Sequence, residues 1–96
     1  MKRVEILAVC SHPEILQTIL RLIANTADWN ATGAETEEQA LILLGKQYFD
    51  LVLLGSGMDE NSAGRLKFAA PDMKFIQHYG GGSGLLTAEI YGALYQ

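Results

Sequence analysis

The sequence predicts an α/β domain in which four parallel strands form a doubly wound sheet with helices on both faces. Two strongly apolar runs carry this prediction, Val4–Val9 and Leu51–Leu54. Such runs are typical of strands that are buried on both faces in the middle of a parallel sheet. Segments with helical spacing alternate with these runs and with two weaker strands, and this alternation favours βα units joined by right-handed crossovers.

The first strand is expected over Val4–Val9. Ser11 and Glu14 have the spacing of a capping box, and Pro13 is tolerated in the first turn of the helix that would follow. This helix is expected to end around Asn25. Its apolar residues recur at helical spacing: Ile15, Leu16, Ile19, Leu20 and Ile23.

A short second strand is expected over Trp29–Ala34, at an edge of the sheet, because Gly33 interrupts it. Thr36 would cap a second helix, and Gly45 would terminate it. The residues of this helix that would face the core are Ala40, Leu41 and Leu44.

The third strand is expected over Phe49–Leu54, and a short helix over Ser62–Ala69, which Pro71 would end. Leu66 and Phe68 are the main apolar residues of this helix. The acidic residues of the preceding loop are interpreted as part of a solvated turn: Asp59 and Glu60.

The fourth strand, expected over Lys74–Tyr79, alternates enough in polarity to suggest a less buried face or an edge position. A glycine-rich stretch over residues 80–84 follows it, and then a last helix. Apolar residues of this helix fall on one face: Leu86, Ile90, Ala93 and Leu94.

The 96 residues carry a formal net charge of −4, with 49% hydrophobic and 19% charged residues, which fits one folded domain over residues 1–96. The seven Lys and Arg residues are scattered, so no nucleic-acid partner is expected. The single cysteine, Cys10, excludes an internal disulfide and fits a reducing compartment. No apolar run is long enough to span a membrane, and the start lacks the apolar core of a signal peptide, so a cytoplasmic location is expected.

Three of these segments resemble a response-regulator receiver domain of two-component signalling, most clearly over residues 3 to about 70. They are Ile6–Val9, Pro13–Leu16 and Phe49–Leu54, and Met58 and Gly64 match the loop and helix start that follow the third strand. The resemblance implies a flavodoxin-like sheet with strand order 2-1-3-4. The fifth strand of that family is missing here.

The positions that carry phosphoryl chemistry in that family hold other residues in this chain. The resemblance implies two magnesium-binding acids after the first strand, where this sequence has Cys10 and Ser11. Gly55 stands at the position of the phosphoacceptor aspartate, and Tyr79 is nearest to that of the phosphate-sensing Ser or Thr. Phosphoryl transfer needs an acceptor oxygen and a cation held by carboxylates. We therefore expect no phosphorylation, no enzymatic activity, no cofactor and no metal.

Three further features are candidate sites. Cys10 lies beside a helix start, two residues before His12, and is a candidate redox switch, although a buried structural role is favoured. The stretch Gly80-Gly81-Gly82-Ser83-Gly84 is a candidate anion or small-ligand loop, and the favoured alternative is a tight crossover. His78 lacks a second ligand at the spacing of a metal site.

Without a fifth strand, the fourth strand becomes an open edge, which invites pairing with another chain. We therefore predict a homodimer through this edge or the adjoining face of the last helix. The function expected is that of a non-phosphorylatable, receiver-like regulatory module that acts by protein–protein contact, with other signalling proteins as further partners. The alternatives are small-ligand or anion sensing at the strand ends, and redox switching at Cys10. The candidate interface residues are Phe75, Ile76, His78, Tyr91 and Tyr95.

Overall fold

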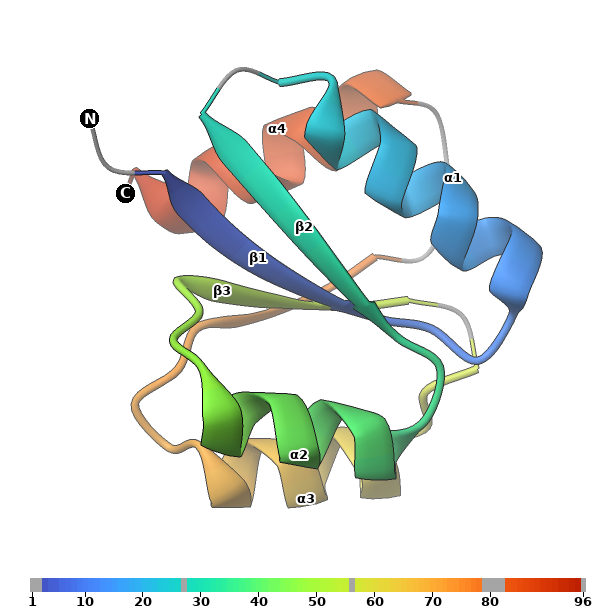
Figure 1. Ribbon diagram of the computed structural model, residues 1–96, viewed down its shortest axis with the longest axis vertical. Coiled ribbons are helices and arrows are strands. Elements are labelled where there is room, and N and C mark those ends of the chain that lie inside the picture. Colours follow the sequence, from blue (N-terminus) through green and yellow to red (C-terminus); the bar gives the residue numbers. More distant parts are fainter. Residues whose placement is uncertain (1–2, 27, 56, 79–82, 96) are drawn as a thin grey trace.

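The computed structural model describes residues 3–26, 28–55, 57–78 and 83–95, which form four βα units (Figure 1). The four strands are parallel and lie in the order β2-β1-β3-β4, so the predicted sheet is confirmed. The elements in chain order are β1 Val4–Val9, α1 Pro13–Ala24, β2 Trp29–Ala34, α2 Glu37–Lys46, β3 Leu51–Leu54, α3 Glu60–Ala69, β4 Phe75–Gln77 and α4 Ser83–Leu94.

The sheet is covered on both faces, as the doubly wound fold requires. Figure 1 shows α1 and α4 on one face and α2 and α3 on the other. Each face holds its own cluster of buried apolar side chains. Along β1 and β3, alternate residues supply the two clusters: Ile6, Ala8, Leu51 and Leu53 face α1 and α4, while Leu7, Val9, Val52 and Leu54 face α2 and α3.

The third strand starts at Leu51 and not at Phe49 as predicted. The backbone N–H of Glu5 donates to the Asp50 carboxylate at 2.8 Å, and the Asp50 N–H donates to the Glu5 carbonyl at 2.7 Å. The Asp50 carboxylate thus replaces the backbone carbonyl that would accept the Glu5 N–H if the strand extended further. The ladder between β1 and β3 therefore begins one residue later, at the pair Ile6–Leu51.

The capping box predicted from Ser11 and Glu14 is wrong. The N-cap of α1 is His12, which has extended backbone angles and makes no side-chain capping hydrogen bond. Pro13 at the first helical position forces the residue before it out of the helical region, so Ser11 lies one residue too early to cap.

Two other helix boundaries differ from the predictions. Gly45 does not end α2, which continues to Lys46 and is closed by the Gln47 N–H on the Leu43 carbonyl. The helix α3 begins at Glu60, because the Asp59 carboxylate accepts the Ser62 N–H at 2.8 Å and caps it. The predicted cap at Thr36 is confirmed, since its hydroxyl accepts the Gln39 N–H at 3.1 Å.

Of the two main apolar residues of α3, Leu66 is buried, whereas Phe68 is 88% exposed. Ala63 and Leu66 face the sheet, and Phe68, two positions beyond Leu66, lies on the far side of the helix. The fourth strand is shorter than predicted, spanning Phe75–Gln77, and Gly84 belongs to α4 and not to the loop before it. None of the helices in the described ranges is long and apolar enough to cross a membrane.

Candidate functional site

The carboxyl ends of β1 and β3 lie side by side, and the residues that directly follow them are Cys10 and Gly55. Both are buried, and the Gly55 N–H donates to the Val9 carbonyl at 2.7 Å. A Cβ added to Gly55 would lie 3.1 Å from the Cys10 Cβ, 3.4 Å from its Sγ and 3.4 Å from the Ile19 Cδ1. Thiol and methyl groups fill the space where a longer side chain at position 55 would begin.

Cys10 is part of the apolar core between the sheet and α1. Its exposed fraction is 0%, and its Sγ lies 3.6 Å from the His12 carbonyl oxygen, toward which the thiol donates. A redox switch needs a thiolate that solvent and oxidant can reach. The burial of Cys10 therefore supports the structural role, and the His12 contact is made by a backbone oxygen and not by the imidazole.

The loop after β3 folds back over Ser11. Gly57 has a φ of 87°, in the left-handed region that favours glycine. A Cβ at Gly57 would clash with the Ser11 hydroxyl and with the Ser11 Cβ. Ser11 itself is exposed at this edge.

At the carboxyl end of β4, His78 is buried and joined to α4. The His78 ring Nδ1 lies 2.5 Å from the Glu89 Oε1. The backbone N–H of His78 donates to the Leu54 carbonyl at 2.8 Å. Sequence reasoning did not find Glu89, since only the placement of α4 brings it to the strand. Tyr79 and the glycines 80–82, predicted as site residues, lie outside the described residues, while Ser83 and Gly84 begin α4.

A groove of about 770 Å³ lies beside His78, between β4 and α3. Its charged lining residues are Asp59, Glu60 and Lys67, which gives two carboxylates to one ammonium group. In the described part of the chain no three His, Cys, Asp or Glu side chains come together to hold a metal ion.

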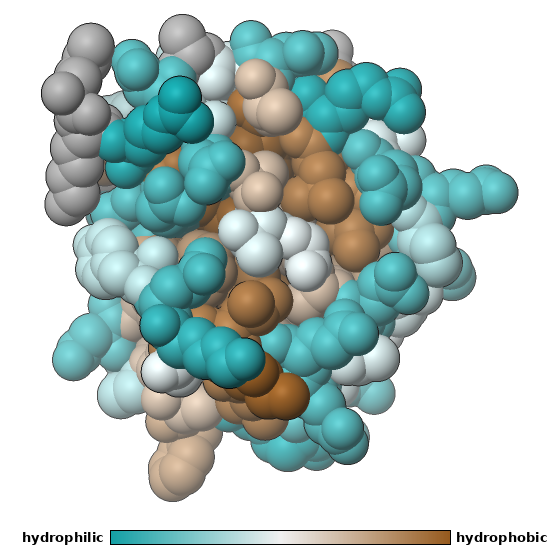
Figure 2. Space-filling view, in the orientation of Figure 1, coloured by the Kyte–Doolittle hydropathy of each residue, from teal (hydrophilic) through white to brown (hydrophobic). Residues whose placement is uncertain are grey.

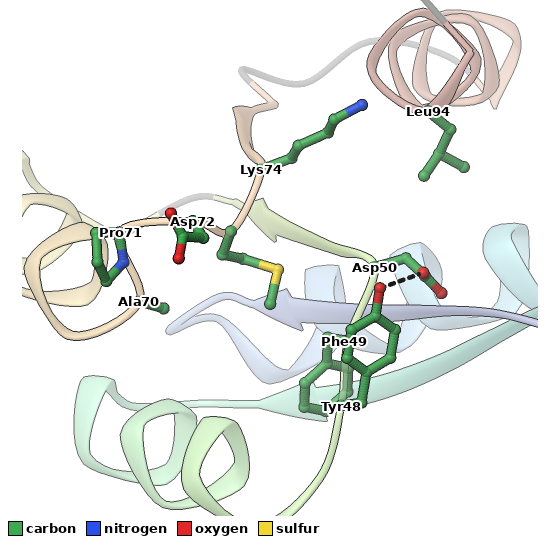
Figure 3. Close-up of a pocket in the computed structure, with 9 residues that line it drawn as sticks. Tyr48, Phe49, Asp50, Ala70, Pro71, Asp72, Lys74 and Leu94 are labelled. Atoms are coloured by element: carbon green, nitrogen blue, oxygen red, sulfur yellow. Dashed lines mark hydrogen bonds between the residues drawn. The ribbon is translucent and has the colours of Figure 1, made fainter.

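A second pocket, of about 500 Å³, lies at the opposite end of the sheet (Figure 3). Figure 3 shows the Tyr48 hydroxyl directed at Asp50, and this hydrogen bond is 2.9 Å long. The Asp50 Oδ1 holds Tyr48 while its Oδ2 holds the Glu5 amide, so this carboxylate joins strand pairing to the pocket rim. In the sequence, the only sign of this arrangement is that Asp50 stands immediately before the buried strand.

Lys74 also lines this pocket, and its ammonium group donates to the Ala93 carbonyl at 2.8 Å. Ala93 is in the last turn of α4, where carbonyl groups lack helical partners and a cation is favourable. With the His78–Glu89 contact, Lys74 ties the fourth strand to α4 at both ends of that strand.

The outer edge of β4 borders a groove of about 550 Å³ that the predicted interface residues Phe75 and Ile76 line with α4. Tyr91 is directed elsewhere: its ring centroid lies 4.9 Å from that of Trp29 in β2, and the Tyr95 ring follows at 5.4 Å from Tyr91. Tyr91 therefore lies on the flank of α4 that faces β2, away from the β4 edge, and Tyr95, directly after α4, lies beside it. The remaining groove residues are Lys74, Ala88, Glu89, Gly92 and Ala93.

No protein-family model matches the sequence, and comparison with curated proteins gives no match. Solved structures do match. The signal receiver domain of an HD domain-containing protein from Pseudomonas fluorescens Pf-5 is 28% identical with a TM-score of 0.70, covering 96% of this chain and 76% of that one. The response regulator TrrA from Thermotoga maritima, in complex with Mg²⁺ and BeF, is 25% identical with a TM-score of 0.66, covering 90% and 81%.

A LuxR family DNA-binding response regulator from Silicibacter pomeroyi is 26% identical with a TM-score of 0.66, covering 91% of this chain and 70% of that one. Together, the strand order and the paired helix layers define a doubly wound, flavodoxin-like domain. Its structural neighbours are response-regulator receiver domains, so the resemblance seen in the sequence is confirmed. The fold supports a role as a signalling, regulatory module.

Proposed function

We propose that this chain is a receiver-like regulatory module that accepts no phosphoryl group and acts through contacts with other proteins, as a homodimer. The contact between Cys10 and Gly55 carries the proposal. At the carboxyl ends of the two central strands, where open α/β sheets place their sites, this contact is apolar and closed.

The chemistry of the neighbouring groups supports the same conclusion. Phosphoryl transfer needs an acceptor oxygen beside a cation held by carboxylates. Cys10 and Gly55 offer neither, and a thiol is a poor ligand for a hard divalent ion. The carboxylate of Asp59, the first acid after β3, is engaged as the cap of α3.

The end of the sheet supports the homodimer. In the described structure β4 pairs with β3 on one side, and its other side borders the α4 groove. An exposed strand edge is a template for pairing with another chain. We place the interface on this edge and the adjoining face of α4, with Phe75 and Ile76 on the strand and His78 directly after it.

The test of the phosphoryl half of the proposal uses the intact chain with Mg²⁺. We expect no phosphoryl incorporation from acetyl phosphate by intact-mass measurement, and no change in Tm on adding beryllofluoride. A receiver domain with an intact acidic site, treated identically, is the positive control. Stoichiometric incorporation, or a rise in Tm with beryllofluoride, would overturn this half.

The association half is tested by light scattering across a concentration series. We expect a mass near twice 10.5 kDa at the upper concentrations, falling toward 10.5 kDa on dilution. A mass of 10.5 kDa throughout would contradict the homodimer and leave contacts with other proteins as the mode of action.

One observation favours a second candidate, the sensing of a small ligand at the strand ends. The groove beside His78 is large enough for such a ligand. Its two carboxylates and single ammonium group favour a neutral or cationic molecule over the anion that the glycine-rich stretch suggested. A rise in Tm in a screen of such molecules, lost in His78→Ala, would support it.

A further inference from the structure

We infer that the partner at the β4 edge is a second copy of this chain, paired antiparallel, with the two-fold axis passing beside Ile76. The inference rests on the proposed homodimer and specifies its register. Three features lead to it: the backbone groups of β4, the charges at its two ends, and the groove beside it.

The hydrogen bonds between β3 and β4 fix which backbone groups point outward. The Lys74 carbonyl accepts the Val52 N–H at 2.9 Å, and the His78 N–H donates to the Leu54 carbonyl. In a parallel ladder, residues 74, 76 and 78 therefore point their backbone groups at β3, and Phe75 and Gln77 point theirs outward.

Among pairings that involve described residues alone, only an axis beside Ile76 uses both outward residues of each copy. In that register Phe75 pairs with Gln77 of the partner subunit, and Gln77 pairs with Phe75 of the partner subunit, as two hydrogen-bonded pairs. An axis beside Phe75 would instead face Gln77 with the partner's Met73, whose N–H already donates to the Ala70 carbonyl in its own chain.

The charges at the ends of β4 agree with this register. Lys74, Ile76 and His78 share the face that carries α4, since Lys74 bonds to Ala93 and His78 to Glu89. The Ile76 axis places Lys74 opposite the partner's His78, and hence beside the carboxylate of the partner's Glu89. The two-fold symmetry repeats this contact between opposite charges at the other end of the paired strands.

The other edge of the sheet, β2, lacks this complementarity. Figure 2 shows the face over this edge, with an apolar band across its middle and hydrophilic residues around it. The residues that flank β2, however, are both acidic, Asp28 and Glu35. Antiparallel pairing of β2 with its own copy would bring these carboxylates together, and like charges in apposition oppose association.

The groove beside β4 can receive the partner's side chain. It is lined on α4 by Ala88, Glu89, Gly92 and Ala93, and a Cβ built on Gly92 meets nothing within 4 Å. The partner's Ile76, directly across the axis from Ile76, would fill the space beside Ala88, Gly92 and Ala93. A three-residue strand alone falls short of a standard interface, so the two α4 faces would supply most of the buried area.

Disulfide formation measures the register directly. Across the axis the two Ile76 residues form a non-hydrogen-bonded pair with Cα atoms about 4.5 Å apart, a separation that a disulfide spans. We expect Ile76→Cys to form a covalent dimer under mild oxidation, and Phe75→Cys and Gln77→Cys each to remain uncrosslinked. The wild type, with its buried Cys10, gives the background.

The outcomes separate this inference from the proposed function. Crosslinking by Phe75→Cys or Gln77→Cys alone would show another register, and crosslinking by Ala31→Cys would show pairing through β2. In either case the homodimer stands and this inference falls. A wild type that is monomeric at every concentration, with no variant crosslinking, overturns both.

Charge reversal tests the predicted contact between Lys74 and the partner's Glu89. Lys74→Glu and Glu89→Lys should each weaken self-association at least tenfold, because each repeats a like-charge contact at both ends. Mixed in equal amounts, the two variants should recover a dimer, since each contact then joins opposite charges. Lys67→Glu, on α3, is the matched control and should leave association unchanged. Folded single variants that stay dimeric, or a mixture of folded variants that stays monomeric, would overturn the register.

Discussion

Gly55 lies where Cys10 and Ile19 converge, so its lack of a side chain is a packing requirement at this point of the structure. We predict that Gly55→Ala destabilises the fold by about 1–3 kcal/mol, because the added methyl group would overpack a buried site. Chemical unfolding in urea measures this. The matched control is Gly64→Ala, because Gly64 lies in α3 with nothing within 4 Å of an added Cβ.

Gly64→Ala should instead raise the free energy of unfolding by about 0.5–1 kcal/mol, since alanine has a higher helix propensity than glycine. Equal and small effects of the two substitutions would mean that the Cys10–Gly55 contact is loose. The carboxyl ends of β1 and β3 would then have room for a longer side chain, which contradicts a closed strand end.

Asp59 gives a pH dependence whose sign can be worked out. The backbone N–H of Ser62 is the main cause that holds the pKa of the Asp59 carboxyl below its usual value. Because the folded pKa lies below the unfolded one, ionised Asp59 contributes stability that is fully present above the unfolded pKa. This contribution is lost as the pH falls through the folded pKa.

We predict that Asp59→Asn, which can still cap a helix, reduces the loss of stability between neutral and strongly acidic pH. Urea unfolding of the wild type and the variant across that range measures the difference. Asp72→Asn, at an exposed residue of the α3–β4 turn, is the control. An Asp59→Asn profile parallel to that of the wild type would contradict the capping interaction.

At the scale of the elements, Asp50 joins two strands and a loop through one carboxylate. We predict that Asp50→Ala destabilises the protein by about 1–3 kcal/mol, because the partly buried Glu5 N–H would lose its acceptor. Asp50→Asn should cost less, since its amide oxygen still accepts. Tyr48→Phe, which removes the hydrogen bond to the Asp50 Oδ1 and keeps the Glu5 bond to the Oδ2, should have a smaller effect, and thermal unfolding ranks the three variants.

If Tyr48→Phe reduces the stability as much as Asp50→Ala, Asp50 stabilises the fold through Tyr48 at the pocket rim and not through strand pairing. The three variants therefore separate the two bonds of one carboxylate, which a single substitution cannot do.

The elements that sequence could predict are those whose signal is local and repeated. The apolar runs of β1 and β3 have no alternative to burial on both faces, and Thr36 caps α2 through an amide three residues away. Phe68 shows the limit, since it is, with Leu66, a main apolar residue of its helix, but the helical phase of Ala63 and Leu66 turns it outward.

The candidate site follows the same division. Parallel strands end at one edge, so the meeting of Cys10 and Gly55 could be expected before the structure. The contact of His78 with Glu89 could not, because it depends on α4 returning to the face of α1 after β4. Lys74 at the last turn of α4 depends on the same placement. Contacts of this kind, between residues far apart in the chain, produce no regular spacing by which the sequence could reveal them.

For the whole molecule, the central question is which surface covers the open side of the sheet beyond β4. If a second copy lies there, folding and association are linked, and the apparent stability must rise with protein concentration. We predict that the Tm of the wild type increases over a hundredfold concentration range. Ile76→Lys should abolish this increase, because it would bury two like charges where the two copies of residue 76 meet at the axis.

The matched control for this substitution is Ile42→Lys. Ile42 is 57% exposed on α2, on the opposite face of the sheet, so its replacement changes the charge equally without touching the β4 edge. We expect Ile42→Lys to keep the concentration dependence of the wild type. If Ile76→Lys keeps it as well, the chains associate through another surface. If the wild type has none, the module binds other proteins as a monomer, and its open edge becomes the first surface on which to seek them.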